Sequence, residues 1–257
     1  MNEIPVVRIT DGVDMPVIGF GTWQMNGEQA YDAIRWALEA GYRHIDTATA
    51  YKNEAEVGRA VRDSGVDRGE LFITTKLPPD NVGRERQTLS DSLRALGTDY
   101  VDLWLIHWPP RRPDASERVW RAFLELRSEG LCRSVGVSNY SPEEIDALTG
   151  ATGQVPQVNQ VPWSPSEHDP ALLAALRDRG VVVEGYSPLL GAQLTAPALT
   201  GIAEAHGVSA AQVILRWHVQ MGIVVIPKSV HRERIESNLD LFSFELTEAE
   251  MAELSAS

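Results

Sequence analysis

Four side chains that could act together on a carbonyl group lie in the first half of the chain: Asp46, Tyr51, Lys76 and His107. Lys76 ends an apolar run, so its ammonium group should be buried and should need a carboxylate partner. Asp46 ends the preceding apolar run and is placed to be that partner. Because a neighbouring lysine stabilises an ionised phenol, we expect the pKa of Tyr51 to fall below its usual value of about 10.

A tyrosine tuned in this way could donate a proton to an alkoxide, and His107 could hydrogen-bond the carbonyl oxygen from the other side. These groups suit the addition of hydride to C=O, in which negative charge develops on oxygen. No side chain supplies hydride, so the chemistry requires a cofactor. Each residue alone also has a structural explanation, such as a helix cap for Asp46 or packing for Tyr51 and His107. The prediction of carbonyl chemistry therefore rests on the four residues occurring together.

Short apolar runs that alternate with amphipathic stretches must position these residues. Strands are predicted at residues 18–22, 43–46, 71–76, 101–107, 133–138, 157–160, 181–186 and 223–227. Helices are predicted at residues 27–40, 53–63, 84–96, 117–129, 142–148, 170–179, 209–221, 232–239 and 247–255. Asn53 and Ser141 are suited to cap helix N-termini. Left-handed C-caps are expected at Gly41, Gly97, Gly130 and Gly180.

The strand–helix alternation predicts a parallel sheet that is covered on both faces. An open Rossmann sheet would carry a Gly-x-Gly-x-x-Gly turn after its first strand, and Gly19-Phe20-Gly21-Thr22-Trp23 lacks the third glycine. We therefore predict an α/β fold, a (β/α)8 TIM barrel with an N-terminal β-hairpin, as a single domain over residues 1–257.

Functional groups of such barrels gather where the strands end. The predicted strands end in polar or amphipathic residues, which together would form a polar floor for a ligand: Thr22, Asp46, Lys76, His107, Ser138-Asn139, Gln160, Tyr186 and Lys228. A zinc site is not expected, because the histidines lack a His-Glu-x-x-His spacing and there is one cysteine. A serine hydrolase is not expected either, because no Gly-x-Ser-x-Gly elbow occurs.

The formal net charge of -13 argues against nucleic acid as a partner. It makes one basic cluster informative, because a chain this acidic must concentrate its positive charge to bind an anion: Lys228-Ser229-Val230-His231-Arg232-Glu233-Arg234. No apolar stretch approaches the roughly 20 residues that span a bilayer, and no signal peptide is apparent. We expect a cytoplasmic monomer that binds neither membrane nor nucleic acid.

The chain resembles the aldo-keto reductases, among which bacterial members such as diketogluconate reductase are similar to it. Eight segments carry the resemblance, in the family's order: Gly19-Phe20-Gly21-Thr22-Trp23, His44-Ile45-Asp46-Thr47-Ala48 to Tyr51, Thr75-Lys76, Leu105-Ile106-His107-Trp108-Pro109, Gly136-Val137-Ser138-Asn139, Val158-Asn159-Gln160, Tyr186-Ser187-Pro188-Leu189 and Ile226-Pro227-Lys228-Ser229. The resemblance implies that Tyr51 is the general acid, tuned by Lys76 and Asp46, and that His107 orients and polarises the carbonyl of an aldehyde or ketone.

The resemblance also implies NADPH/NADP+ as the cofactor. Ser138, Asn139 and Gln160 would bind the nicotinamide carboxamide, and Tyr186 would stack on the ring. The remaining implied contacts are Ser187 and Leu189 along the pyrophosphate, Lys228, Ser229 and Arg234 at the 2′-phosphate, Asn238 near the adenine, and Thr22, Asp46 and Val230 elsewhere on the cofactor. Two cations at the ribose favour NADPH over NADH. Trp23 and Trp108 would line the substrate pocket.

The sequence ends after residues 247–255, without the long C-terminal loop that covers the substrate pocket in many members. The segment after His107 is short as well, which predicts an open site and broad specificity. Two alternatives to an NADPH-dependent reductase stand beside this prediction. One is a non-catalytic NADPH-binding barrel with a regulatory or structural role, and the other is an NAD-linked alcohol dehydrogenase.

Overall fold

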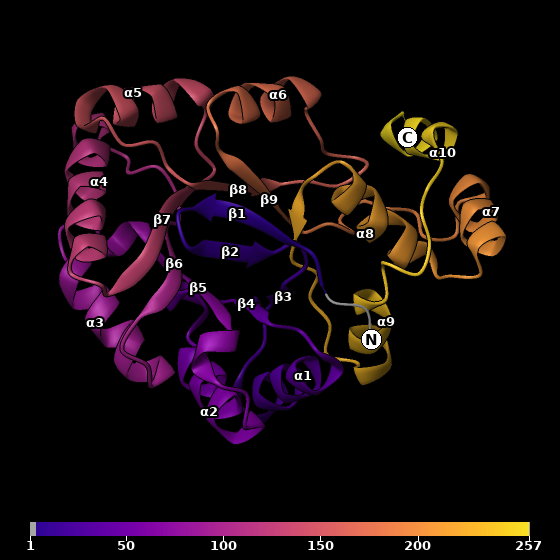
Figure 1. The fold of residues 1–257 in the computed structure, drawn as a ribbon, viewed down its shortest axis with the longest axis horizontal. Coiled ribbons are helices and arrows are strands. Elements are labelled where there is room, and N and C mark those ends of the chain that lie inside the picture. The colour runs from indigo at the N-terminus through magenta and orange to yellow at the C-terminus, as the bar shows by residue number, and fades with distance from the viewer. Residues whose placement is uncertain (1–3, 257) are drawn as a thin grey trace.

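Eight parallel strands form one sheet whose order in space follows the order in sequence (Figure 1). The computed structural model describes residues 4–256, apart from the side chains of residues 113 and 114. The strands are β3 (Phe20–Gly21), β4 (His44–Asp46), β5 (Phe72–Leu77), β6 (Val101–Ile106), β7 (Cys132–Ser138), β8 (Val158–Pro162), β9 (Val182–Tyr186) and β10 (Val224–Val225). All eight predicted strands are present, the first and last being shorter than expected.

The sheet closes on itself between its first and last strands. The amide of Gly19 donates to the carbonyl of Val225 at 2.9 Å, and that of Gly21 donates to the carbonyl of Pro227 at 3.1 Å. A Cβ atom on Gly21 would lie 2.9 Å from the carbonyl oxygen of Ile226, so the close approach at this seam requires glycine. The predicted barrel is thereby confirmed.

Helices surround the barrel (Figure 1). They are α1 (Gly27–Ala40), α2 (Glu54–Ser64), α3 (Glu85–Leu96), α4 (Pro113–Ser128), α5 (Pro142–Thr152), α6 (Pro170–Asp178), α7 (Pro197–His206), α8 (Ala210–Gln220), α9 (Arg232–Leu239) and α10 (Glu248–Ser255). Two expectations were wrong. Helix α4 begins at residue 113 instead of 117, and α7 was not predicted, so two helices rather than one follow β9.

The helix caps agree with the sequence in position but not always in mechanism. Ser141 forms a capping box with Glu144 at the start of α5, as its type predicts. Asn53 occupies the N-cap of α2 without making a side-chain cap. Its amide instead donates to the carbonyls of Thr22 and Met25, at 2.8 and 3.0 Å, and so ties the loop after β3 to α2. The four predicted C-cap glycines all have positive φ.

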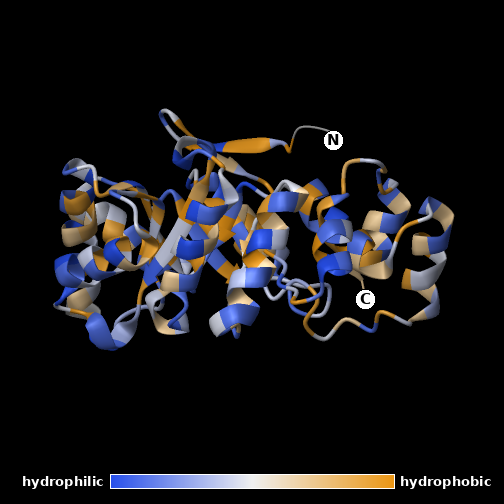
Figure 2. Ribbon diagram, turned by 90° about the horizontal axis from the view of Figure 1, so that it is seen from below, coloured by the Kyte–Doolittle hydropathy of each residue, from blue (hydrophilic) through white to orange (hydrophobic). Residues whose placement is uncertain are grey.

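The expected N-terminal hairpin, β1 (Val6–Thr10) and β2 (Val13–Pro16), lies across one end of the barrel (Figure 2). Its buried side chains Ile9, Val13 and Met15 join an apolar cluster with residues of strands β5, β6, β8 and β10: Phe72, Leu103, Leu105, Val158 and Val224. This cluster fills the N-terminal half of the barrel interior. A separate and larger core packs the outside of the barrel against the helices. The polar interior residues therefore lie above an apolar plug.

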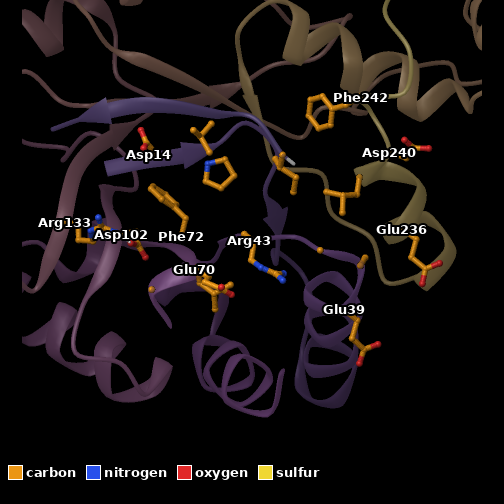
Figure 3. A pocket seen from close by; sticks show the side chains of 18 of the residues that line it. Asp14, Glu39, Arg43, Glu70, Phe72, Asp102, Arg133, Glu236, Asp240 and Phe242 are labelled. Atoms are coloured by element: carbon orange, nitrogen blue, oxygen red, sulfur yellow. Dashed lines mark hydrogen bonds and ion pairs between the residues drawn. The ribbon is translucent and has the colours of Figure 1, made fainter. Parts of the chain in front are cut away.

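A cavity of about 760 Å³ opens beside the hairpin, between it, α1 and α9 (Figure 3). Its lining includes Arg43, Phe72 and Asp102, all from the N-terminal ends of their strands or the residue before, and Glu236 from α9. None of Asp46, Tyr51, Lys76 and His107 lines it. This cavity is therefore distinct from the site that the sequence predicts.

Candidate active site

Lys76 and Asp46 form a buried ion pair in the barrel interior, as predicted. Lys76 Nζ donates to Asp46 Oδ1 and Oδ2 at 2.6 and 2.7 Å, and to the carbonyl of Thr47 at 3.0 Å. Lys76 is fully buried. Burial alone lowers the pKa of Lys76, but the charge of Asp46 and then Tyr51 raise that pKa by more, so the net pKa lies above its usual value. The ammonium group is therefore a fixed positive charge at neutral pH.

Tyr51 ends a short 3-10 turn, Thr49–Tyr51, that follows β4. Its hydroxyl lies 3.4 Å from Lys76 Nζ, and Thr49 Oγ1 donates to the Lys76 carbonyl at 3.0 Å, which ties the turn to β5. The expected lowering of the tyrosine pKa was wrong. Burial raises the pKa of Tyr51 by more than the charge of Lys76 lowers it. Tyr51 therefore remains protonated at neutral pH.

His107 follows the last residue of β6 and faces Tyr51. The two rings meet edge to face, with centroids 5.8 Å apart. Burial, and then the charge of Lys76, lowers the pKa of His107 to about 3, so its imidazole is neutral at neutral pH. The carbonyl of His107 accepts a hydrogen bond from Asn139 Nδ2 at 3.1 Å, which fixes the backbone here.

Gln160 joins this group from β8, together with a carboxyl group that the sequence analysis missed. Gln160 Nε2 donates to Asp46 Oδ2 at 2.8 Å and to Glu184 Oε2 at 2.8 Å. Burial, and then the charge of Asp46, raises the pKa of Glu184 to about 8. The signal that could have revealed Glu184 is a lone carboxyl residue in the middle of the apolar strand at residues 181–186.

Asn139 connects the predicted cofactor residues at the ends of β7 and β9. Its Nδ2 donates to Ser138 Oγ at 2.9 Å, and its Oδ1 accepts from the hydroxyl of Tyr186 at 2.9 Å. Asn139 and Ser187 have φ values of 64° and 54°, a left-handed conformation that residues with a side chain rarely adopt. Such strain is held in place where the surrounding structure requires it, commonly at functional sites.

Two cations of the basic cluster are free and the third is engaged. Within the described part of the chain, no hydrogen bond or ion pair of the Lys228 or Arg234 side chain is present, and both residues are exposed. Arg232 is paired with Glu236 at 2.9 Å and lies 3.4 Å from Glu39. The two free cations flank the N-terminus of α9, whose unpaired amides favour anions.

The other predicted residues lie around the end of the barrel at which its strands end, which is called the mouth below. Thr22 is buried after β3, and its hydroxyl donates to the carbonyl of Asp46 at 2.9 Å. Ser229 and Asn238 are buried, whereas Val230 and Leu189 are half-buried. Trp23 and Trp108, the predicted substrate residues, are exposed, and so are Leu190 and Leu194, which the sequence analysis did not single out. All four lie in loops that follow strands β3, β6 and β9.

Two further features of the described residues concern metal ions and membranes. No group of three or more His, Cys, Asp and Glu residues there could hold a metal ion. No helix within residues 4–256 combines the length and apolar character needed to cross a membrane.

The fold is a closed α/β barrel, and at its mouth lie a buried Lys–Asp pair, a tyrosine and a histidine. This arrangement is typical of an oxidoreductase site. Comparison with known proteins identifies the family. Residues 17–257 match the model of the Aldo/keto reductase family. The chain belongs to this family, which confirms the expectation of an aldo-keto reductase.

Named relatives cover nearly the whole chain. Morphine 6-dehydrogenase of Pseudomonas putida is 45% identical over 98% of this chain and 91% of its own length. Methylglyoxal reductase DkgA of Escherichia coli is 41% identical over 99% of this chain and 94% of its own. A crystal structure of an aldo/keto reductase from Brucella melitensis superposes with a TM-score of 0.95 at 41% identity, covering 99% of each chain. A Bombyx mori aldo-keto reductase in complex with NADP has a TM-score of 0.92 at 34% identity, over 100% of this chain and 93% of its own.

Proposed function

We propose that this protein reduces aldehydes or ketones to alcohols with NADPH, and that Tyr51 is the general acid. The observation that carries the proposal is the tyrosine hydroxyl 3.4 Å from a buried, fixed lysine charge. NADPH supplies the hydride. Tyr51 donates its proton to the oxygen on which negative charge develops, and Lys76 stabilises the phenolate that remains.

Three residues prepare this proton transfer. Asp46 keeps Lys76 charged and holds its ammonium group beneath Tyr51. The neutral imidazole of His107 faces Tyr51, and from there it would hydrogen-bond the same substrate oxygen and orient it. A neutral His107 also avoids placing a second cation beside Lys76, which a buried site would tolerate poorly.

The residues at the mouth fit NADPH. Gln160, Ser138 and Asn139 offer polar groups for the carboxamide, and the Tyr186 ring, held through its hydroxyl by Asn139, would stack on the nicotinamide. Ser187 and Leu189 would lie along the pyrophosphate. The free Lys228 and Arg234, with the α9 N-terminus and Ser229, suit the 2′-phosphate, and Asn238 would lie near the adenine. Thr22 and Val230 complete the expected contacts. A relative from Bombyx mori crystallised with NADP supports this choice of cofactor.

The loops around the mouth support small, varied carbonyl compounds as substrates. Trp23 and Trp108 are 55% and 48% exposed, and large apolar side chains left open to water commonly mark a binding surface. Such surfaces provide apolar contact with little shape selection. Two relatives, a morphine 6-dehydrogenase and a methylglyoxal reductase, are named for substrates that differ widely in size. We therefore propose broad specificity.

The test is the oxidation of NADPH in the presence of methylglyoxal or nitrobenzaldehyde. Tyr51→Phe removes the proton donor while preserving the ring, so the turnover number should fall by about 100-fold or more. NADPH binding, measured by quenching of tryptophan fluorescence, should persist in this variant. Equal rates for the wild-type and variant proteins would disprove the assignment of Tyr51. NADPH binding without any turnover in the wild type would instead favour a non-catalytic barrel.

A further inference from the structure

Glu184 is a buried carboxyl group to which the proposed reaction gives no role. It lies in β9 directly beside Gln160 of β8, because the two residues are paired in the register of these parallel strands. The Gln160 amide donates one hydrogen bond to Glu184 and one to Asp46, each at 2.8 Å. A side-chain amide has two N–H donors, so both are used inside the barrel.

The two carboxyl groups decide which way the Gln160 amide faces. If its Oε1 faced them, an acceptor would oppose the carboxylate of Asp46, which has no proton to donate, so the nitrogen must face inward and Oε1 must point away. No described residue donates to Gln160 Oε1, and this oxygen is not among the fully buried polar atoms that lack a partner. Gln160 therefore presents a hydrogen-bond acceptor, and no donor, to a ligand in the mouth.

We propose that Glu184 is a positioning residue which, together with Asp46, fixes Gln160 Oε1 as the acceptor for the N–H of the nicotinamide carboxamide. The inference rests on the proposed function, because it needs NADPH in the mouth. Asp46 alone would engage one N–H of Gln160. The second N–H would then be free to turn towards the mouth, where it would oppose the carboxamide N–H, a donor facing a donor.

The far side of Glu184 is enclosed by protein but makes no hydrogen bond, because no described residue bonds to Oε1. Glu184 Oε1 lies 3.5 Å from His44 Nε2, and His44 is itself within 3.3 Å of Thr74 Oγ1. Both His44 and Glu184 are fully buried. A carboxyl oxygen accepts the Gln160 hydrogen bond whether or not the group carries a proton, so the positioning role holds in either state.

The experiment compares the dissociation constants of NADPH and of its reduced 3-acetylpyridine analogue, in which an acetyl group without N–H replaces the carboxamide. The variants are Glu184→Leu and Glu184→Met, which lack an acceptor, and Glu184→Gln, which retains one. Glu54→Met is the matched control, because Glu54 is another buried carboxyl group but binds Thr75 and Ser92 instead of Gln160. The methionine variant of Glu184 serves if the leucine variant does not fold.

Wild-type protein should prefer NADPH, and the preference should shrink by about fivefold, the worth of one neutral hydrogen bond, in the leucine or methionine variant of Glu184. The glutamine variant and the Glu54 control should keep the wild-type preference. An unchanged preference in Glu184→Met, or an equal loss in the Glu54 control, would overturn this inference while leaving NADPH-dependent turnover intact. Failure of the wild type to bind NADPH would overturn the proposed function, and the inference with it.

Discussion

Burial and one lysine set the protonation states at the mouth of the barrel. The pKa of Tyr51 is raised and that of His107 is lowered to about 3, so at neutral pH the site holds a protonated phenol and a neutral imidazole above a fixed ammonium group. Each state follows from desolvation, which disfavours the charged form of any group that lacks a partner. Of these three groups only Lys76 keeps its charge, because Asp46 accompanies it as the counter-charge.

The partnership of Asp46 and Lys76 makes a stability prediction. Asp46→Asn leaves the Lys76 ammonium buried without its counter-charge and should lower the free energy of unfolding by about 3–5 kcal/mol. The double variant Asp46→Asn/Lys76→Met removes both charges and should recover most of that loss, although both variants should be inactive. Urea denaturation of the three proteins provides the measurement. A double variant no more stable than the single one would show that the charge pair is not the cause.

Glu184 should make stability depend on pH. The pKa of Glu184 is about 8 in the folded protein, against 4.5 as its ordinary value, so between these values the folded state binds the proton more tightly than the unfolded state does. The free energy of unfolding should therefore fall as pH rises through this window, by up to about 1.4 kcal/mol per pH unit. Glu184→Gln does not titrate and should gain stability relative to wild type between pH 5 and 8. A constant difference across these pH values in thermal denaturation would contradict this.

His44, which neighbours Glu184, affects the free energy of unfolding at lower pH values and in the opposite direction. Burial lowers the pKa of His44 to about 3, so its contribution to stability grows as pH rises from 3 to 6.5. Above pH 6.5 His44 is mainly neutral in both the folded and the unfolded protein, so its contribution no longer changes with pH. The comparison of the two proteins between pH 6.5 and 8 therefore isolates Glu184.

At the scale of elements, the closure of the barrel depends on backbone contact between the β3 and β10 segments. Gly21→Ala would place a Cβ atom 2.9 Å from the carbonyl oxygen of Ile226, and should cost about 1–3 kcal/mol as the seam opens to admit it. Gly201→Ala is the control, because its Cβ would meet open space within α7 and should stabilise by about 0.5–1 kcal/mol. Equal effects in thermal denaturation would rule out a special role for the seam.

The elements that the sequence predicted are those whose local pattern agrees with their tertiary role. The buried strands read as continuous apolar runs, and Ser141 caps α5 through a local hydrogen bond. Helix α7 was missed because it lacks a side-chain N-cap and only Pro197 marks its start. The cap of Asn53 was misread because distant carbonyls of the β3 loop, which no local pattern reveals, compete for its amide.

The same distinction applies to the candidate site, where some features follow from strand order and others depend on the tertiary surroundings. The meeting of Asp46 with Lys76 follows from adjacent strands, so topology alone predicts it. The direction of the Tyr51 pKa does not follow from a neighbour's charge, because it depends on how much water the fold removes. The positive φ values of Asn139 and Ser187 are likewise not marked in the sequence, because neither residue is a glycine.

At the scale of the whole molecule, this acidic protein must bind an anionic cofactor although its own negative net charge repels it. With a net charge of -13, affinity for NADPH should depend on Lys228 and Arg234, the two cations of the basic cluster that have no acidic partner among the described residues. Lys228→Ala should weaken NADPH binding by about tenfold or more and leave NADH binding nearly unchanged. Isothermal titration with both cofactors provides the measurement.

Arg232→Ala is the matched control for this prediction. Arg232 lies in the same cluster but already pairs with Glu236 and Glu39, so its loss should change NADPH affinity little. If Arg232→Ala weakened NADPH binding as much as Lys228→Ala, general surface charge rather than a phosphate site would explain the result. Tighter binding of NADH than of NADPH by the wild type would favour the NAD-linked dehydrogenase.

The hairpin covers the base of the barrel with the apolar side chains of Ile9, Val13 and Met15. Such a layer disfavours water, so the buried carboxyl group of Glu184 should exchange its proton with the solvent mainly from the mouth. A ligand bound on Gln160, which pairs with Glu184 in register, should therefore slow this proton exchange.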